Sequence, residues 1–302
     1  MAADDAHDVW RVGPAHRPAD AGAVERLSVD LPDGGPTTIY AWRPVEDVGK
    51  LPVLYLHGIQ SHPGWFTRSA EALWRAGYPV YQITRRGSGD SDSEQGDAAS
   101  AGQLLADLTA CRKVALAHAD CRQCHLLGVS WGGKLAAAYA AGGEGAEAIA
   151  SLTLIAPGIA PKVDVSTWTK LGVAACLLVW RKRRFAIPLS DVDLFTDNEA
   201  MRAYLRDDPF RLQTATARFF FTSRRLDWML RRMPRGSIRA ATNLLLASRD
   251  RIIDNAATRQ VVARLTDGRA ATRTIDGCHT MDFEPNPQVF LDALVDAVGR
   301  TD

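Results

Sequence analysis

Short apolar segments that alternate with longer helical segments constrain the fold of this chain more than any other feature of its sequence. The segments 51–58, 124–130 and 149–158 are almost continuously apolar, as strands buried on both faces of a sheet should be. Strands are expected at 24–32, 37–44, 51–58, 78–85, 124–130, 149–158, 242–250 and 271–277, and helices at about 64–76, 100–119, 131–141 and 287–299. The first two strands form a hairpin, and the rest alternate with helices. This order predicts an α/β fold with a mostly parallel, doubly wound sheet of about eight strands.

The alternation stops between Pro157 and Ile238, where the sequence reads as helical and irregular and contains aromatic clusters. The core is therefore expected to consist of residues 24–158 and 238–302, with residues 159–237 inserted as a helical cap. Such an insertion follows the carboxyl end of a strand, where ligands bind in open α/β sheets. Residues 1–23 are expected to be a loose N-terminal leader.

The composition is that of an ordinary soluble globular protein, with 46% hydrophobic and 24% charged residues and a net charge of +1. No run of about 18 or more apolar residues occurs, so no transmembrane helix is expected. The N-terminus has no apolar segment of the kind found in secretory signals, and the five cysteines are an odd number. These features favour a cytoplasmic protein with free thiols. The net charge says nothing about partners, and we expect no nucleic-acid partner.

The segment Cys121-Arg-Gln-Cys124-His125 matches the pattern that attaches c-type haem. Covalent haem attachment generally takes place outside the cytoplasm, and the sequence has no recognisable export signal. Zinc is disfavoured as well, because no second pair of Cys or His residues lies at ligand spacing. We therefore expect no metal and no cofactor, and interpret Cys121 and Cys124 as ordinary thiols before a strand.

The segment Gly128-Val-Ser130-Trp-Gly132 has the spacing G-x-S-x-G and falls at a predicted junction of strand and helix. A sharp turn there forces its central residue to positive φ, and the neighbouring segments leave room only for small residues two positions away. The turn lifts the Ser130 hydroxyl above the sheet at a helix N-terminus, which favours developing negative charge. Ser130 is therefore the predicted nucleophile, and Gly128 and Gly132 are the predicted elbow glycines.

A serine hydroxyl is a weak nucleophile that needs a base, which is in turn held by an acid. With a nucleophile in such an elbow, the acid and then the histidine follow it along the chain. His279 is the only histidine after Ser130, and it directly follows a predicted strand. Asp250 ends the preceding strand and is the predicted acid. Asp254 is the alternative, for which a helix N-cap role together with Asn255 is the simpler interpretation.

An oxyanion intermediate requires two backbone N–H groups. One donor is expected from Trp131, the residue after the nucleophile, and the other from the loop after the third strand. In that loop Gly58 allows the backbone to turn inward, so Ile59 is the predicted second donor. His57 is interpreted as a structural hydrogen-bonding residue.

These residues together carry a family resemblance. His57-Gly58, the stretch Arg86-Gly-Ser-Gly-Asp-Ser91, the elbow from Gly128 to Gly133, Asp250 and His279 occur in the order typical of α/β-hydrolases. Over about residues 24–300 the chain resembles the branch of monoacylglycerol lipases, lysophospholipases and serine aminopeptidases. One departure is Thr84, where related chains often carry a structural Asp two residues before the Arg of the R-G-x-G-x-S stretch.

The resemblance implies the α/β-hydrolase fold and a serine hydrolase that cleaves carboxylic esters through an acyl-enzyme, without a cofactor. The implied substrate is a small-molecule ester or an acylglycerol, and the enzyme would be of the carboxylesterase or monoacylglycerol or lysophospholipid lipase type. An aminopeptidase or amidase is the alternative, and it would need a cap carboxylate such as Asp191, Asp193 or Glu199 to hold the substrate amine. A non-catalytic binding protein of the same fold is a further alternative, but such proteins commonly lose a member of the triad.

The proposed cap is basic. Residues 159–237 contain 15 Lys and Arg against 8 Asp and Glu, a net charge of +7, so the rest of the chain carries −6. Within the cap, an apolar tract at 171–180 precedes Arg181-Lys-Arg-Arg184. One interpretation is an interfacial segment, too short to span a bilayer, that gives peripheral membrane contact through residues 171–184. The other is a helix whose apolar side packs over the site, beside aromatic residues that line an acyl pocket.

Overall fold

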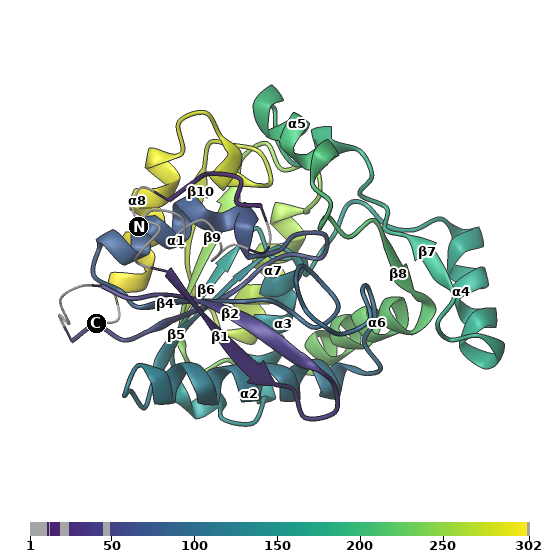
Figure 1. Cartoon of the computed structure of the whole chain (residues 1–302), viewed down its shortest axis with the longest axis horizontal. Coiled ribbons are helices and arrows are strands. Elements are labelled where there is room, and N and C mark those ends of the chain that lie inside the picture. Colours follow the sequence, from purple (N-terminus) through teal and green to yellow (C-terminus); the bar gives the residue numbers. More distant parts are fainter. Residues whose placement is uncertain (1–10, 12, 19–23, 45–48, 301–302) are drawn as a thin grey trace, which may run out of the picture.

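A central eight-stranded sheet organises the molecule (Figure 1). The computed structural model describes residues 11, 13–18, 24–44 and 49–300. The strands, in spatial order, are β1 Val24–Asp30, β2 Pro36–Trp42, β4 Val80–Ile83, β3 Val53–Leu56, β5 Cys124–Val129, β6 Ile149–Ile155, β9 Ala241–Ala247 and β10 Ala271–Ile275. Strand β2 pairs antiparallel with β1 and β4, and all other neighbouring strands are parallel. The predicted α/β class and the mostly parallel sheet are therefore confirmed.

Helices cover both faces of this sheet (Figure 1). On one side α1, Thr67–Arg75, packs against α8, Gln288–Gly299, and on the other α2, Ala101–His118, packs against α3, Trp131–Gly142. Because the central strands lie between these two layers, every residue of β3, β4 and β5 is buried. Helix α7, Asn255–Leu265, follows β9. In the part of the chain that the structure describes, no helix is long and apolar enough to cross a bilayer.

The segment expected to form the cap, residues 159–237, leaves the sheet after β6 and rejoins it at β9. Its elements are α4 Thr167–Val179, β7 Arg184–Ala186, α5 Glu199–Asp207, β8 Thr214–Thr216 and α6 Ala217–Arg232. Figure 1 shows them grouped at one end of the molecule. The antiparallel pair β7–β8 was not expected from the sequence, because strands of three residues are too short to show an alternating pattern.

Part of the segment expected to be a loose leader contacts the loop before α1, α1 itself and α5. The backbone N–H of Ala15 donates to the carbonyl of Gly64 at 2.8 Å, and the carbonyl of His16 accepts from the Thr67 hydroxyl at 2.7 Å. The carbonyl of Gly13 accepts from the Tyr204 hydroxyl at 2.8 Å. Of the expected leader, residues 1–10, 12 and 19–23 lie outside the described residues.

Candidate active site

Ser130 joins β5 to α3, and its backbone lies at φ 52° and ψ −123°. A non-glycine residue at positive φ persists only when its surroundings hold it there. The N–H of Ser130 donates to the carbonyl of Ile155 at 2.9 Å. The carbonyl of Ser130 accepts from the N–H groups of Gly133 at 2.9 Å and Gly158 at 2.6 Å. Hydrogen bonds to β6, to the loop that follows it and to α3 therefore fix the sharp turn.

The two elbow glycines lie where a side chain would collide with neighbouring backbone. A Cβ atom on Gly128 would come within 2.7 Å of the Gly132 carbonyl oxygen. A Cβ atom on Gly132 would overlap the carbonyl oxygens of Leu56 and His57, at the end of β3. The close approach of α3 to Gly128 and of β3 to Gly132 therefore explains why the sequence has glycine at these positions.

Ser130, His279 and Asp250 form a chain of two hydrogen bonds. The Nε2 atom of His279 lies 2.9 Å from Ser130 Oγ, and its Nδ1 atom lies 2.8 Å from Asp250 Oδ2. Each residue follows the carboxyl end of a different parallel strand, β5, β10 and β9 respectively. His279 and Asp250 are buried, with 2% and 5% of their surface exposed. The fold thus brings together three residues that are far apart in the sequence.

The surroundings of Asp250 keep its carboxylate ionised and thereby set the tautomer of His279. Its Oδ1 atom accepts hydrogen bonds from the N–H groups of Ile252 and Ile253, both at 2.8 Å. Burial alone would raise the pKa of Asp250, but the nearby His279 and these hydrogen bonds outweigh it and lower the pKa below 3.8. An ionised Asp250 can only accept, so Nδ1 of His279 carries a proton and Nε2 is free to accept the hydroxyl proton of Ser130.

Asp254, the alternative acid, has a different role in the structure. It is the N-cap of α7, and its Oδ1 atom accepts from the N–H of Ala257 at 3.0 Å. The carboxylate that meets His279 belongs to Asp250.

The backbone N–H groups of Ile59 and Trp131 donate to no residue that the structure describes. The loop carrying Ile59 passes directly beside the nucleophile, since a Cβ atom on Gly58 would lie 3.4 Å from Ser130 Cβ. His57 bonds within this loop, with Nδ1 2.9 Å from the Gly58 carbonyl oxygen. Burial, with a smaller effect from the charge of Arg85, keeps the pKa of His57 well below its usual range, so the ring is neutral at neutral pH.

Two residues of the haem-like pattern, Cys124 and His125, lie inside the core, and Cys121 is half-buried. His125 is buried in β5, where Nδ1 lies 2.7 Å from the Ser151 hydroxyl and the ring packs edge-on against Tyr78. Cys124 is fully buried, and burial raises the pKa of its thiol to about 12. Among the described residues no group of three or more His, Cys, Asp or Glu side chains is placed to hold a metal ion. The pattern therefore has a packing explanation.

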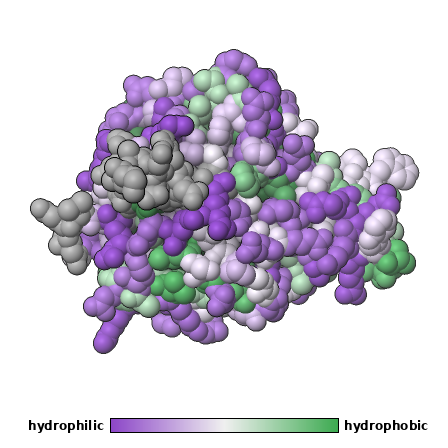
Figure 2. Space-filling view, in the orientation of Figure 1, coloured by the Kyte–Doolittle hydropathy of each residue, from purple (hydrophilic) through white to green (hydrophobic). Residues whose placement is uncertain are grey.

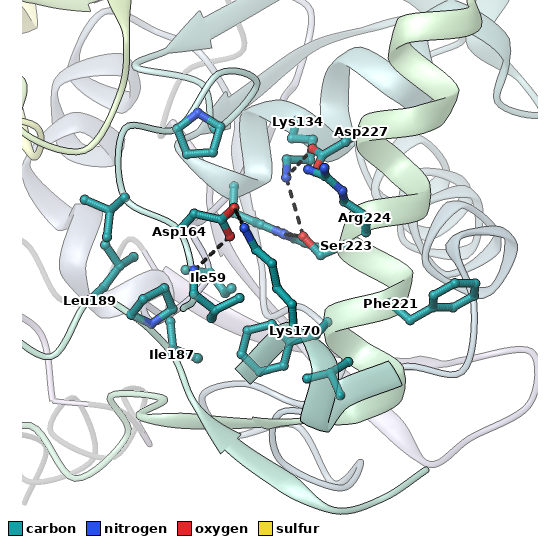
Figure 3. A pocket seen from close by; sticks show the side chains of 18 of the residues that line it. Ile59, Lys134, Asp164, Lys170, Ile187, Leu189, Phe221, Ser223, Arg224 and Asp227 are labelled. Atoms are coloured by element: carbon teal, nitrogen blue, oxygen red, sulfur yellow. Dashed lines mark hydrogen bonds and ion pairs between the residues drawn. The ribbon is translucent and has the colours of Figure 1, made fainter. Parts of the chain in front are cut away.

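A cavity of about 400 Å³ opens beside Ser130, with walls that include residues of the segment 159–237 (Figure 3). Its lining is mostly apolar and includes Val173, Ala174 and Leu177 of α4, Ile187, Leu189 and Phe220. Figure 3 shows Ile59, Ile187 and Leu189 on one side, opposite Lys134, Ser223 and Asp227. Of the cap aromatic residues, Phe220 and Phe221 line the cavity, whereas Phe219 stacks on Trp131 with ring centroids 5.4 Å apart.

Sequence reasoning missed the polar residues of this cavity. Lys134 Nζ lies 2.6 Å from Asp227 Oδ1, and the indole N–H of Trp131 donates to the Ser223 hydroxyl at 2.8 Å. Lys134 was detectable in principle, because it lies four residues after Ser130 and hence on the same helix face. Ser223 and Asp227 come from α6, and no local pattern links that helix to the elbow.

Asp197, in the segment 159–237, contacts the two loops that carry Asp250 and His279. Its carboxylate accepts from Arg249 and Arg251 at 2.8 Å each, and these residues flank Asp250. It also lies 3.1 Å from the thiol of Cys278, which precedes His279. Four positions scattered along the sequence meet at this point, so no spacing could have indicated it.

Several solved structures of α/β-hydrolases share this fold. A monoacylglycerol lipase from Paleococcus ferrophilus is 18% identical, with a TM-score of 0.70 over 92% of this chain and 99% of that chain. A soluble variant of monoglyceride lipase from Saccharomyces cerevisiae, in complex with a substrate analog, is 18% identical, with a TM-score of 0.76 over 96% and 98% of the two chains. A carboxyl esterase from Bacillus coagulans, in complex with glycerol, is 13% identical, with a TM-score of 0.76 over 92% and 99%.

At these identities the similarity shows the fold alone. No curated protein matches the sequence. The family model described as serine aminopeptidase, S33, matches residues 50–286, which is most of the chain. The chain therefore belongs to the serine aminopeptidase S33 family of hydrolases.

Proposed function

We propose that the protein is a serine hydrolase that cleaves carboxylic esters, with Ser130, His279 and Asp250 as its triad. The observation that carries the proposal is the pair of hydrogen bonds that links these residues, at 2.9 and 2.8 Å, beside a largely apolar cavity. The membership of the chain in a hydrolase family supports it. A non-catalytic binding role is disfavoured, because all three groups are present and in hydrogen-bonding contact.

The reaction would proceed through an acyl-enzyme. Ser130 Oγ attacks the ester carbonyl while Nε2 of His279 takes the hydroxyl proton and then passes it to the leaving alcohol. Asp250 holds the imidazole in position and stabilises its protonated form. The N–H groups of Ile59 and Trp131 would hold the oxyanion. A water molecule activated by His279 then attacks the acyl-enzyme, releases the acid and restores Ser130.

The cavity favours a substrate with an apolar acyl group. In the division that we propose, residues 24–158 and 238–302 form the core, 159–237 form the cap, and the cavity lies where the two meet. The walls from α4 and from Ile187 and Leu189 would surround an alkyl chain. Structures of this fold include a monoacylglycerol lipase and a carboxyl esterase with glycerol, which supports small esters or acylglycerols as substrates.

Ester cleavage is favoured over aminopeptidase activity by the pairing of the cavity carboxylates. Asp164 lies 2.6 Å from Lys170 Nζ, and Asp227 lies 2.6 Å from Lys134 Nζ. Both are neutralised by a lysine, so neither is free to hold a substrate amine. Of the candidates from the sequence, Asp193 pairs with Arg202, Glu199 pairs with Arg202 and Arg206, and Asp191 caps a short helix.

The test is a panel of p-nitrophenyl esters from acetate to palmitate beside aminoacyl anilides. We expect ester turnover that Ser130→Ala abolishes without loss of fold, and fluorophosphonate labelling of Ser130. Turnover of anilides alone would replace the ester proposal with the amidase alternative. Labelling at another residue would show that Ser130 is not the nucleophile.

We also propose that α4 contacts an anionic lipid surface at the periphery of a cytoplasmic membrane. The inner side of α4 lines the cavity, but Trp168, Leu178 and Val179 are 82–86% exposed. Figure 2 shows hydrophobic surface at the outer end of the cap, where Figure 1 places α4. Large apolar side chains on the solvent-facing side of a helix often mark a site that binds a membrane or another molecule. The adjacent basic residues favour a membrane with a negatively charged surface.

Not all of the basic run is available to lipid. Lys182 pairs with Glu94 at 2.7 Å, and Arg184 donates to the Gln95 carbonyl at 2.7 Å. No carboxylate of the described residues pairs with Arg181 or Arg183, so these two remain as outward cations. Together they would contribute about 2 kcal/mol near an anionic surface.

Co-sedimentation with phosphatidylglycerol vesicles tests this contact. We expect wild-type protein to pellet at low salt, and the double variant Leu178→Ser, Val179→Ser to remain in solution. Val289→Ser is the matched control, because Val289 is an exposed apolar residue on α8, outside the cap. Equal, negligible pelleting of wild type and double variant would reject membrane contact and leave α4 as part of a plain lid.

A further inference from the structure

Arg85, at the carboxyl end of β4, is a buried cation that the mechanism above does not use. Only 4% of its surface is exposed, yet its guanidinium has no carboxylate within ion-pair distance among the described residues. The adjacent Arg86 is different, since its Nε and Nη2 atoms bond to Asp107 at 2.7 Å. Burying a charge without a counter-ion costs several kcal/mol, so its position calls for a reason.

The guanidinium of Arg85 contacts both residues whose N–H groups would hold the oxyanion. Its Nη2 atom donates to the carbonyl of Ile59 at 3.0 Å. Its Cζ atom lies 4.8 Å from the ring centroid of Trp131. One side chain therefore bridges the loop after β3 and the first residue of α3, the two separate segments that form the oxyanion hole.

The backbone of Arg85 fixes the same loop in a second way. Its N–H donates to Nε2 of His57 at 3.1 Å, so the proton of the neutral His57 ring lies on Nδ1. Nδ1–H then donates to the carbonyl of Gly58 at 2.9 Å. This carbonyl belongs to the same planar peptide group as the N–H of Ile59, so the hydrogen bond orients and polarises that donor.

The charge of Arg85 is present at neutral pH and close to the reaction. Burial lowers the pKa of its guanidinium from 12.5 to about 9, which still leaves it protonated. From its contact with Ile59, the charge lies about 8 Å from the oxyanion position. At an effective dielectric constant of about 20, a unit charge at that distance changes the rate about 30-fold, or about 2 kcal/mol.

We infer that Arg85 is the positioning residue of the oxyanion hole and supplies its fixed positive charge. It holds Ile59 and Trp131 at their places and stabilises the negative charge that develops between them, without touching substrate. The inference rests on the proposed function, because it requires an oxyanion at Ser130.

The experiment compares Arg85→Gln, which keeps a hydrogen-bond donor without charge, with Arg85→Lys, which keeps the charge. We expect Arg85→Gln to lower kcat about 30-fold with KM little changed, and to weaken an alkyl boronic acid inhibitor by the same factor. Arg85→Lys should stay within about threefold of wild type in both measurements. Arg112→Gln is the control, since Arg112 is a buried arginine bonded to Tyr139 and remote from the triad.

The boronic acid separates this role from a merely structural one, because it forms an oxyanion-like adduct. A folded Arg85→Gln variant with wild-type kcat and inhibitor affinity would overturn the inference, while active wild type and inactive Ser130→Ala would leave the proposed function intact. If Arg85→Gln does not fold, a well-folded Arg85→Lys variant that loses about 30-fold would exclude the charge as the cause. Failure of the boronic acid to inhibit wild type would instead refute the proposed function.

Discussion

Asp250→Asn tests the acid of the triad with the smallest change of shape. The Oδ1 atom of Asp250 accepts from two backbone N–H groups, so an Asn at this position will keep its oxygen there. Its amide nitrogen must then face Nδ1 of His279, where Asp250 Oδ2 now accepts at 2.8 Å. An N–H facing Nδ1 forces the ring proton onto Nε2, the atom that must accept from Ser130. The variant therefore holds its base in the wrong tautomer.

The expected loss in kcat is about 10⁴-fold, the scale found for this substitution in a Ser-His-Asp triad, which corresponds to about 5.5 kcal/mol in transition-state free energy. The free energy of unfolding should change by only about 1 kcal/mol, because the two hydrogen bonds from Ile252 and Ile253 persist. Asp254→Asn is the matched control. Asn is as good an N-cap as Asp, so both activity and stability should stay close to wild type.

The assay is steady-state hydrolysis of a p-nitrophenyl ester, with thermal unfolding measured on the same samples. Wild-type and Asp254→Asn proteins should agree within about tenfold in kcat. If Asp250→Asn also stays within tenfold, or if Asp254→Asn is the more damaged variant, the reasoning from tautomer and hydrogen bonds is refuted.

Three further predictions concern the elbow, the core and the cap. Gly132→Ala should destabilise the fold by about 2 kcal/mol or more, because its Cβ would strike the backbone at the end of β3. A Cβ atom on Gly102, in α2, would lie 3.7 Å from the Ser100 hydroxyl, so Gly102→Ala should be neutral or stabilising in thermal unfolding. Burial raises the pKa of Asp282 from 3.8 to about 6, so its contribution to stability is full below pH 3.8 and is lost as the pH rises through 6. Asp282→Asn should therefore raise Tm at pH 8, raise it about half as much at pH 5 and leave it nearly unchanged below pH 3.8. An equal shift at pH 8 and pH 5 would contradict the assignment. Asp197→Asn should lower kcat measurably, though by less than about tenfold, at unchanged KM. Glu199→Gln, nearby on α5, should leave kcat at the wild-type value, and equal kinetics of the two variants would leave Asp197 with no positioning role.

The central sheet was predictable because its signals are local. The apolar runs that became β3, β5 and β6 differ from the structure by only a few residues at each end. The nucleophile elbow was predictable for the same reason, since five consecutive residues encode both the strand-to-helix turn and the small residues that let neighbouring segments pass close to it. His279 could be proposed as the base without any knowledge of the geometry, because it is the only histidine after Ser130.

The cap was less predictable, because its contacts join distant segments. For the tract 171–184 the sequence left two orientations open, and in the structure α4 lines the cavity with one side and exposes large apolar side chains on the other. The contacts of Asp197 and the bridge formed by Arg85 depend on loops from several strands. Only the assembled sheet brings those loops to one edge.

The order of the triad along the chain has a consequence for how activity appears during refolding. Ser130 and His279 are 149 residues apart in sequence, and the whole cap lies between them. Contacts of such long range form late, because closing a long loop costs entropy before any contact repays it. The helical circular dichroism signal should therefore recover before esterase activity does. Activity measured with an ester at intervals during refolding would report when β9 and β10 pair with the strands that precede residue 159.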